Sequence, residues 1–598
     1  MNYSRNRLLL LGLLLLPMVA PEAFAQPERK SDTFVTEYLD PVAIVWKQGI
    51  ENGTNLLLPY SGQVSTTEPV VTLFRKGDAV LLDFGKEIQG RIQIVRALQD
   101  EKTSSRFRVR LGESVSEAMS DVETSSATND HAMRDFTLEV PWLGVAESGR
   151  SGFRFARIDL LDDGPAIPIV AVRAASEYRD LPWKGAFHCS DPRLDAIWET
   201  GAYTVQLNMQ EYLWDGIKRD RLVWIGDMHP EVMTIHTVFG GQDVIRRSLD
   251  YVRDHTAPDQ WMNNMCSYSM WWVIIHRDMY RYEGDLDYLR EQHAYLQNLL
   301  PFIISNIDGG KENFHGGTRF LDWPTSEIPD VIHAGLQGLA IMTLEAGEEL
   351  CRALDDEVLE KKCRRAAAQL AKHVPDACGN NQAAAMLSLA GLVSPSAAAS
   401  VILRNGTEAF SSFYGYYMLE ALARAGEYDA AMRFISEYWG GMLDLGATTF
   451  WEDFSYPDKS RSSRIDRLLP EGAYDIHGEG GAYCYEGFRL SMCHGWASGP
   501  TSWLSRYVLG ISPAAPGFSK VKIDPHLGSL EWAGGSFPTP YGEIRVVHRK
   551  KADGTVESEI ELPENIEIVP QNLNDEKMVC IGGGTPVGDA APGQDRKR

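Results

Sequence analysis

The chain is 598 residues long and carries a formal net charge of −24 at pH 7. Such an acidic chain is unsuited to binding nucleic acid, whose phosphates demand a basic surface, and its length indicates several domains. Its 15 Trp and 23 Tyr exceed what core packing requires and suit stacking against flat apolar ligand faces.

The N-terminus has the pattern of an export signal. Arg5 and Arg7 precede the apolar run Leu8–Ala20, and Ala23–Ala25 offers small residues at a cleavage site. This pattern predicts a secretory signal over residues 1–25 that is removed on export. The run is too short for a membrane anchor, and no later stretch reaches about 18 uninterrupted apolar residues. We therefore expect a secreted or periplasmic protein with no membrane span.

The cysteines do not indicate a metal or redox site. The eight cysteines include no C-x-x-C pair. An exported protein can form disulfides, and Cys351 with Cys363 or Cys484 with Cys493 are candidate pairs. Buried free thiols are an equally good interpretation.

The first part of the chain, residues 26–182, is predicted to form a β-sandwich. Its segments alternate polar and apolar residues or run apolar, and Gly, Pro and Asp separate them. The clearest strand-like segments are Ala79–Gly85, Gly90–Leu98, Phe107–Glu113 and Phe153–Leu161.

Residues 183–511 change to helical periodicity. Ser190 and Asp191 can cap a first helix, Pro192 suits its first turn, and apolar residues then recur at helical spacing. About a dozen helices joined by long loops predict paired hairpins that close into an (α/α)6 toroid. The predicted segments are Ser190–Leu213, Gln242–Asp254, Ser267–Tyr282, Leu286–Ile304, Ile332–Leu354, Asp356–His373, Ser411–Ala425, Tyr428–Trp439 and Pro500–Leu509.

Strand patterns return after Pro513, so residues 512–569 are predicted to form a C-terminal β-sandwich. The Gly- and Pro-rich tail, 570–598, is expected to be mobile. The fold class is therefore multidomain, with a central (α/α)6 toroid flanked by N-terminal and C-terminal β-sandwich domains.

One short stretch, "DGIKRDRLVWIGD" (Asp215–Asp227), concentrates charges of both signs around a tryptophan. It follows the first long helix, so it is predicted to be a loop over the helical scaffold. Asp215, Asp220 and Asp227 can converge there, with Arg219 and Arg221 keeping some of them ionised. Trp224 offers a face on which a sugar can stack.

A second acidic candidate lies far along the chain. Cleavage of a glycosidic bond needs one carboxylic acid to protonate the leaving oxygen and one carboxylate to act opposite it. Glu452, in "TTFWEDF", is flanked by Trp451 and Phe454, and a carboxylate in an aromatic wall is a candidate for a shifted pKa.

Several motifs together resemble the α-L-rhamnosidases of glycoside hydrolase family 78. They occur in order between about residues 183 and 546. They are "WDGIKRDRLVWIGD", "RFLDWP", "TTFWEDF", "MCHGWASGPTSWLSRYVLGI" and "PGFSKVKIDPHLGSLEWAGGSFPTPYGEIRV". The resemblance implies an exo-acting enzyme that hydrolyses terminal α-L-rhamnosyl residues of plant or algal glycans or glycosides with inversion of configuration.

The resemblance also implies roles for the charged stretch. One form of the family's motif has Asp, then Glu five residues later, then Asp seven beyond, and Asp215, Asp220 and Asp227 reproduce this spacing. The leading Asp binds rhamnose hydroxyls, and Asp220 stands where the family has its general acid. Another form of the motif reads R-D-E-R, and in that alignment the chain lacks the Glu. Asp227 and Glu231 are then the alternative acids.

Glu452 matches the family's general base, which activates water. His494 matches a histidine of the sugar subsite, and Asp322 with Trp323 resembles a substrate-contacting motif. An apolar wall is expected beside the C6 methyl group of rhamnose. The predicted substrate-binding residues are Asp215, Arg219, Trp224, Asp227, Asp322, Trp323, Trp451 and His494. No metal-ligand spacing is present, and we expect neither metal nor cofactor.

Other interpretations of the same residues are structural. The stretch from Asp215 to Asp227 can form a salt-bridge network alone, and Glu452 can be the ion-pair partner of Arg461 or Arg464. His494 can hold a backbone carbonyl in a core. Trp271 and Trp272 are expected to be divided between core and pocket.

Two further functional classes remain open. One is a toroidal exo-glycosidase or polysaccharide lyase for another sugar, and the other is a non-catalytic sugar-binding relative.

Overall fold

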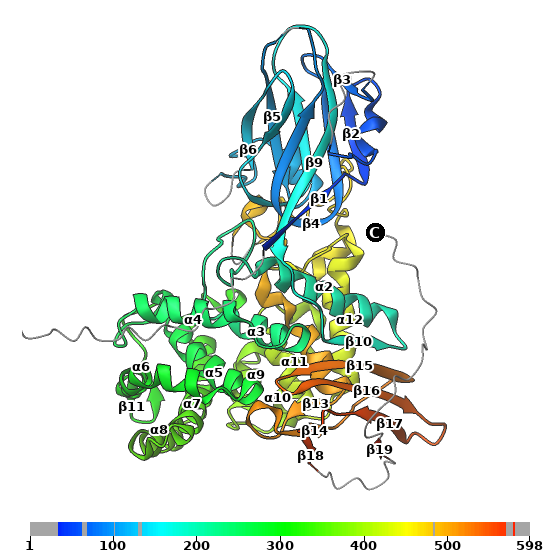
Figure 1. Ribbon diagram of the computed structural model, residues 1–598. Helices are drawn as coiled ribbons and strands as arrows, with labels where there is room; N and C mark the ends of the chain where they lie inside the picture. The colour runs from blue at the N-terminus through cyan, green and yellow to red at the C-terminus, as the bar shows by residue number, and fades with distance from the viewer. Residues whose placement is uncertain are drawn as a thin grey trace, which may run out of the picture.

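The computed structural model describes residues 34–62, 69–100, 102–129, 134–481 and 485–569, together with the backbone of 578–580. The predicted signal segment and most of the predicted tail lie outside these residues. Figure 1 shows the N-terminal strands standing on the helical region, with the C-terminal strands beside the helices below. Among the described helices, none combines the length and apolar character needed to cross a membrane.

A nine-stranded antiparallel sheet forms the N-terminal region, ordered β1-β9-β4-β8-β5-β6, with β2 and β7 also on β4 and β3 on β9. The two segments predicted around residues 79–98 are one long strand, β4. Its register against β8 shifts between Asp83 and Ile88, where Gly85 has a φ of 83°, so the chain bends without leaving the sheet. The strands are β1 (Phe34–Leu39), β2 (Ala43–Gln48), β3 (Thr72–Phe74), β4 (Ala79–Arg96), β5 (Ser105–Gly112), β6 (Asp135–Val140), β7 (Gly144–Glu147), β8 (Ser151–Leu160) and β9 (Ile167–Arg179).

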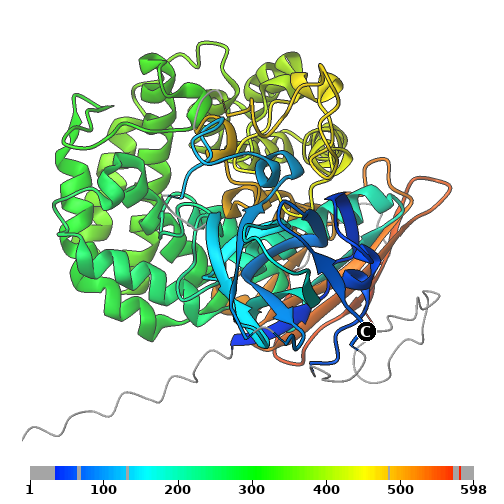
Figure 2. The same cartoon turned by 90° about the horizontal axis from the view of Figure 1, so that it is seen from above.

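Thirteen α-helices lie in the described residues. The short α1 follows β5, and the others form one curved wall when the molecule is seen from above (Figure 2). The Asp191 side chain caps α2, as predicted. The helices are α1 (Val115–Met119), α2 (Pro192–Asn208), α3 (Met228–Val238), α4 (Asp243–His255), α5 (Cys266–Glu283), α6 (Leu286–Ser305), α7 (Pro329–Ala353), α8 (Glu357–Leu370), α9 (Asn381–Leu389), α10 (Pro395–Asn405), α11 (Gly415–Arg424), α12 (Tyr428–Asp444) and α13 (Gly499–Trp503).

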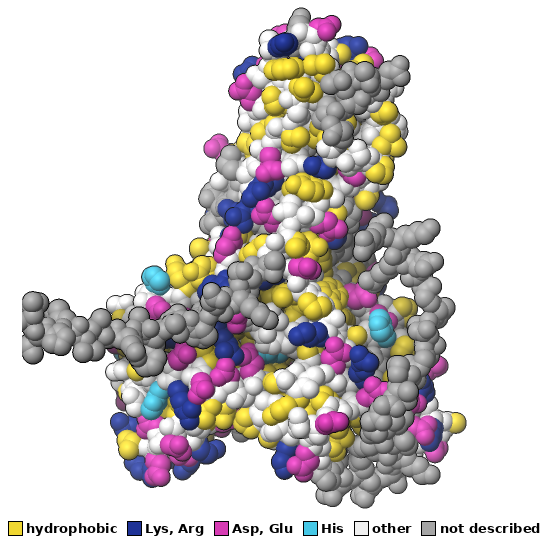
Figure 3. Space-filling model, in the orientation of Figure 1, with side chains coloured by type: hydrophobic (Ala, Val, Ile, Leu, Met, Phe, Trp, Pro, Cys, Tyr) yellow, Lys and Arg dark blue, Asp and Glu magenta, His cyan; other side chains and the backbone are white. Residues whose placement is uncertain are grey.

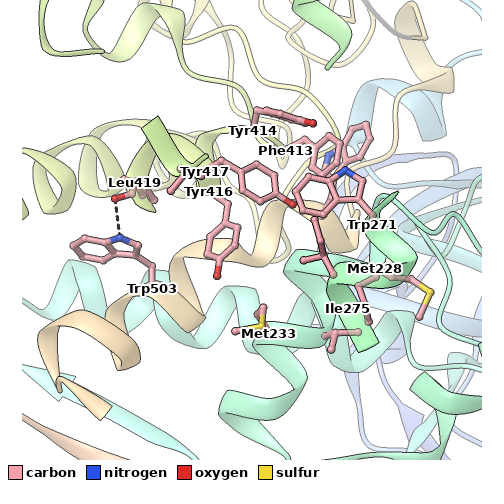
Figure 4. Close-up of a cluster of buried hydrophobic side chains, with 14 of the residues drawn as sticks. Met228, Met233, Trp271, Ile275, Phe413, Tyr414, Tyr416, Tyr417, Leu419 and Trp503 are labelled. Carbon is pink, nitrogen blue, oxygen red and sulfur yellow. Dashed lines mark hydrogen bonds between the residues drawn. The ribbon is translucent and has the colours of Figure 1, made fainter. Parts of the chain in front are cut away.

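Aromatic side chains fill the centre of the helical region. Figure 4 shows Tyr416 and Tyr417 of α11 beside Trp271 of α5, and the rings of Trp271 and Tyr417 stack at 4.8 Å. The indole of Trp503 donates a hydrogen bond to the Leu419 carbonyl. Trp271 and Trp272 are both fully buried. The expected division of these two tryptophans between core and pocket is therefore wrong.

The C-terminal region contains a five-stranded sheet, ordered β10-β15-β16-β17-β19, and a three-stranded sheet, β13-β14-β18. Strand β10 precedes the helical region in the chain but pairs antiparallel with β15. The two ends of the helical region are thereby tied to one sheet. These strands are β10 (Ala186–Cys189), β13 (Ile511–Pro513), β14 (Lys520–Ile523), β15 (Trp532–Thr539), β16 (Gly542–Lys550), β17 (Val556–Glu561), β18 (Glu567–Ile568) and β19 (Met578–Cys580).

Of the two interpretations left open for Cys351 and Cys363, a disulfide or buried free thiols, the structure shows the second. Cys351 of α7 and Cys363 of α8 are buried free thiols that contact each other. Cys493 is also a buried free thiol, and its candidate partner Cys484 lies outside the described residues.

On the face shown in Figure 3, Lys and Arg are interspersed with Asp and Glu.

Candidate active site

The charged stretch after α2 forms a closed loop. The backbone N–H of Asp215 donates to the Leu222 carbonyl at 3.1 Å. The Asp215 carboxylate in turn accepts the N–H groups of Asp220, at 2.9 Å, and Leu222, at 3.0 Å. Burial, partly offset by His494, raises the pKa of Asp215 to about 7. Asp215 therefore shapes the turn that carries Lys218, Arg219 and Asp220.

Lys218 ties this loop to the N-terminal sheet. Its buried ammonium lies 2.9 Å from Glu113 and 3.0 Å from Glu117, and both carboxylates are buried too. Glu113 also accepts the backbone N–H of Met492 at 2.9 Å. The acids Glu113 and Glu117 lie close to His477, in a cluster that has donor atoms for a metal. Lys218 supplies the positive charge there.

Arg219 connects the two predicted catalytic carboxylates. Its Nη1 lies 3.0 Å from Asp220 Oδ1, and its Nη2 lies 2.6 Å from Glu452 Oε2. The Tyr485 ring packs on the guanidinium, 3.6 Å from its central carbon to the ring centroid. The structure therefore brings Asp220 and Glu452 together on neighbouring nitrogens of one side chain.

Glu452 is buried and held in place from two sides. It accepts the Ser491 N–H at 3.1 Å in addition to the Arg219 contact. Burial acts to raise the pKa of Glu452, but Arg219 and His494 outweigh it and hold the pKa below its ordinary value. Glu452 is therefore ionised at neutral pH, as a general base must be. The interpretation in which Glu452 is the ion-pair partner of Arg461 or Arg464 is wrong, because those two guanidinium groups pair with Asp458 and Asp466 instead.

Asp227 and His494 form a second buried pair beside this site. His494 Nε2 lies 3.1 Å from Asp227 Oδ2, and Tyr268 donates to Oδ1 of the same carboxylate at 2.9 Å. Burial acts to lower the pKa of His494, but Glu452 and Asp227 outweigh it and raise the pKa. Its Nδ1 is buried and has no hydrogen-bond partner in the described structure. This nitrogen is a polar group that a ligand oxygen can satisfy.

Glu231, one of the alternative acids, lies deeper in the protein. Its side chain is fully buried, and a Cβ at Gly495 would overlap the carboxyl, so a glycine is required there. Burial raises the pKa of Glu231 well above its ordinary value, and Asp227 and Asp215 add to this effect. Glu231 is therefore a carboxyl group enclosed by protein, in surroundings that favour its protonated form.

The remaining predicted site residues differ in accessibility. Trp224 and Trp323 are half-buried, and Trp323 lies edge-on to Tyr485. Trp451 is 1% exposed and packs edge-on against Phe454, so it does not offer a face to a sugar. The predicted contact of Trp451 with the sugar is not supported, because a stacking ring must be accessible.

Asp322 is also used within the protein. Its carboxylate accepts the Trp323 N–H at 2.9 Å, Ser411 at 2.6 Å and Gln382 at 3.1 Å. Burial raises the pKa of Asp322 to about 6. These contacts make Asp322 a residue that orients the loop bearing Trp323.

Sequence reasoning missed Lys218, Glu113, Glu117 and Tyr485 as supports of the site. The acids lie in the N-terminal region, Glu113 just after β5 and Glu117 on α1, and Glu117 is 101 residues from Lys218. No spacing rule connects residues so far apart. The only available signal was the unexplained lysine inside the charged stretch.

Lys218→Met is expected to lower the free energy of unfolding by about 3–5 kcal/mol, because it leaves two buried carboxylates without their cation. Urea unfolding monitored by circular dichroism measures this loss. Adding Glu117→Gln to Lys218→Met should restore part of the stability, whereas Lys522→Met, at a half-exposed pair with Asp524, should cost little. An unchanged unfolding midpoint in Lys218→Met would contradict the buried ion cluster.

A separate cavity of about 600 Å³ lies among α3, α5, α7 and α11 and contains neither Asp220 nor Glu452. Several of its charges neutralise one another, as in the pairs Arg277–Asp278, Arg281–Glu349 and Arg506–Glu420. The chemistry of the carboxylates, and not cavity size, therefore locates the candidate active site.

Two family models match the chain. Residues 182–338 match the bacterial alpha-L-rhamnosidase 6 hairpin glycosidase domain, and residues 510–579 match the bacterial alpha-L-rhamnosidase C-terminal domain. The first match includes the Asp215–Asp227 stretch and the second includes most of the C-terminal strands.

Individual relatives agree with these matches. An alpha-L-rhamnosidase of Alteromonas sp. (strain LOR) is 24% identical over 550 residues, covering 82% of this chain and 56% of that protein. The GH78 family rhamnosidase of Bacillus sp. GL1 superposes with a TM-score of 0.70 at 21% identity, covering 89% of this chain and 56% of that one. A rhamnosidase from Klebsiella oxytoca with rhamnose bound gives a TM-score of 0.64 at 20% identity, covering 79% and 96%.

The chain thus spans little more than half the length of the Alteromonas and Bacillus relatives. The structural likenesses show a shared fold, and the two matched domains come from one kind of enzyme. On these grounds the chain is similar to the α-L-rhamnosidases of glycoside hydrolase family 78 in its two matched domains and in its fold.

Proposed function

We propose that the chain is an exported, exo-acting α-L-rhamnosidase that removes terminal α-L-rhamnosyl residues from plant or algal glycans or glycosides with inversion of configuration. It is secreted or periplasmic, and its helical region is an (α/α)6 toroid flanked by β-sandwiches. The proposal needs neither metal nor cofactor, because the reaction runs on two carboxyl groups.

In this mechanism Asp220 is the general acid and Glu452 the general base. Asp220 protonates the leaving oxygen, while Glu452 removes a proton from the water that attacks the opposite face of the sugar. The observation that carries the proposal is the position of both carboxylates on Arg219. One rigid, planar cation fixes the two groups relative to each other and keeps Glu452 ionised.

The sugar-binding groups follow from the same site. Asp215 and Asp227 have further acceptor capacity for rhamnose hydroxyls, and the buried Nδ1 of His494 lacks a partner in the described structure. The half-buried Trp224 and Trp323 are the accessible candidates for the apolar wall beside the C6 methyl group.

The proposal is tested with matched 4-nitrophenyl α-L-rhamnoside and α-L-mannoside. The mannoside adds one hydroxyl at C6, and an apolar wall rejects such an addition by only about 10- to 200-fold. We therefore expect kcat/KM to favour the rhamnoside by that factor. No hydrolysis of the rhamnoside would favour a non-catalytic sugar-binding relative, and faster hydrolysis of the mannoside would remove the rhamnose assignment.

Arg219→Met is expected to lower kcat by on the order of 100-fold, because the two carboxylates lose their shared support. Burial of Glu452 is then no longer offset by Arg219, so its pKa should rise. Activity requires the ionised base, and the acidic limb of the kcat/KM profile should therefore move to higher pH. An acidic limb at the wild-type position would show that Arg219 does not control the ionisation of Glu452.

A further inference from the structure

One oxygen of Glu113 joins two segments of the candidate active site. Glu113 directly follows β5 of the N-terminal sheet. Its Oε2 lies 2.9 Å from the Lys218 ammonium and also accepts the Met492 N–H at 2.9 Å. Its other oxygen, Oε1, is buried and has no hydrogen-bond partner within the described residues. The shared Oε2 is therefore the atom through which Glu113 contacts the site.

Each of these two contacts leads to Glu452 through the next residue along the chain. Lys218 precedes Arg219, whose Nη2 lies 2.6 Å from Glu452 Oε2. Met492 follows Ser491, whose N–H donates to the same carboxylate oxygen at 3.1 Å. The Glu452 N–H in turn donates to the Ser491 carbonyl at 2.9 Å. A shift of the shared oxygen would therefore reach both groups that hold the proposed base.

The turn that carries Glu113 is buried and closely hydrogen-bonded. The Glu113 N–H donates to the Glu117 carboxylate at 2.8 Å, and the Ser114 side chain caps α1 by accepting the Glu117 N–H. Ser114 Oγ also lies 2.7 Å from His477 Nδ1, and His477 Nε2 lies 3.1 Å from the Leu490 carbonyl oxygen. All five residues are buried. A group supported in this way can hold its partners in the narrow range of positions that catalysis requires.

Glu117 gives Lys218 a counter-ion that does not depend on Glu113. The Glu117 carboxylate lies 3.0 Å from the Lys218 ammonium. Burial acts to lower the pKa of Lys218, but Glu113 and Glu117 outweigh it and raise the pKa. Loss of the Glu113 charge would thus leave Lys218 paired with one buried carboxylate. A substitution of Glu113 can therefore remove the shared oxygen without leaving a buried cation unpaired.

We propose that Glu113 is a positioning residue for the proposed hydrolysis. By holding Lys218 and Met492 on one oxygen, it sets the positions of the two hydrogen-bond donors around Glu452. The N-terminal sheet region is then a part of the catalytic unit. This inference rests on the proposed function, with Glu452 as its general base.

Three substitutions of Glu113 test this role in the full chain with 4-nitrophenyl α-L-rhamnoside. Glu113→Ala removes the shared oxygen and should lower kcat by about 10- to 100-fold, because a shift of catalytic groups by about 1 Å can cost that much. Glu113→Asp keeps the charge but draws the oxygen back by one methylene group, and should show a similar loss. Glu113→Gln keeps an oxygen that can accept both hydrogen bonds, and should stay within a few-fold of wild type.

The acidic limb of the kcat/KM profile separates positioning from stability. Against the effect of burial, Arg219 and the Ser491 N–H act to lower the pKa of Glu452. When Glu113→Ala or Glu113→Asp loosens these contacts, that pKa should rise, and the ionised base is then lost at a higher pH. The acidic limb should therefore move to higher pH in these two variants and stay in place in Glu113→Gln.

Asp83→Ala is a matched control. Asp83 is a buried carboxylate of β4, and its partner Arg154 lies 2.8 Å away and donates to the Gly446 carbonyl at 2.9 Å. This ion pair also joins the N-terminal sheet to the helical region, but in the described structure it has no hydrogen bond to Lys218 or Glu452. Asp83→Ala should lower the unfolding midpoint and leave kcat and the acidic limb at their wild-type values.

Wild-type kcat and an unmoved acidic limb in folded Glu113→Ala would overturn the positioning role. If that variant does not fold, Glu113→Asp and Glu113→Gln decide the question, and equal kcat values in those two would overturn it. If the wild-type protein hydrolyses the aryl rhamnoside in these cases, the proposed function stands and only the role of Glu113 fails. If the wild-type protein does not hydrolyse it, the proposed function fails, and the positioning role fails with it.

Discussion

Glu452→Gln should reduce kcat by about 100- to 10,000-fold or more while leaving rhamnose affinity within a few-fold of wild type. The amide keeps the size of the side chain and can still accept hydrogen bonds from Arg219 and Ser491, but it cannot take a proton from water. Stopped assays with an aryl rhamnoside measure the loss, and calorimetric titration with rhamnose measures binding.

A loss of kcat with nearly unchanged rhamnose affinity in Glu452→Gln would distinguish a catalytic role of Glu452 from a structural one. A structural ion-pair partner of Arg219 would affect stability and leave kcat largely unchanged in the folded variant. Glu437→Gln is a suitable control, because it makes the same chemical change on the surface of α12 at a residue that has no role in the site. Wild-type kcat in a folded Glu452→Gln variant would remove Glu452 from the mechanism.

Asp220→Asn should have an effect that depends on the leaving group. A general acid matters most when the departing oxygen is basic, so kcat/KM should fall by about 100- to 10,000-fold for a rhamnosyl sugar. For 2,4-dinitrophenyl α-L-rhamnoside, whose phenolate leaves without a proton, the loss should be much smaller. Rates on both substrates, compared for wild type and variant, give the result.

The same comparison distinguishes the alternative acids. Asp227 is occupied by His494 and Tyr268, and Glu231 is enclosed, so Asp227→Asn and Glu231→Gln should lower both rates together. If one of these variants shows the leaving-group dependence and Asp220→Asn does not, the alignment that places Asp220 at the family's acid position is wrong. The hydrolytic function would survive that result.

The helices that the sequence predicted well have one apolar and one polar face. In α4, Val244, Ile245, Leu249 and Val252 are buried while the charged residues face solvent, which gives the periodicity its signal. All eleven residues of α3 are buried, and those of α9 are too, so no alternation marks either helix. Strand β10 was missed for another reason, since its partner β15 lies more than 300 residues away.

Within the site, predictability followed distance along the chain. Asp215, Asp220 and Asp227 lie within one short motif, and the loop that Asp215 closes brings their roles together. Arg219 and Glu452 are 233 residues apart, and no pattern in either segment predicts that their side chains are in contact. The sequence also could not reveal that Trp451 is covered, because burial depends on how the whole helical region packs.

The configuration of the first sugar released shows whether hydrolysis inverts the anomeric centre. Proton NMR can follow hydrolysis of an aryl α-L-rhamnoside fast enough to see which anomer forms before mutarotation mixes the two. Because Asp220 and Glu452 are proposed to act on opposite faces of the sugar, we expect β-L-rhamnose as the first product. Initial formation of α-L-rhamnose would mean retention, and would contradict the assignment of Glu452 as a base that activates water.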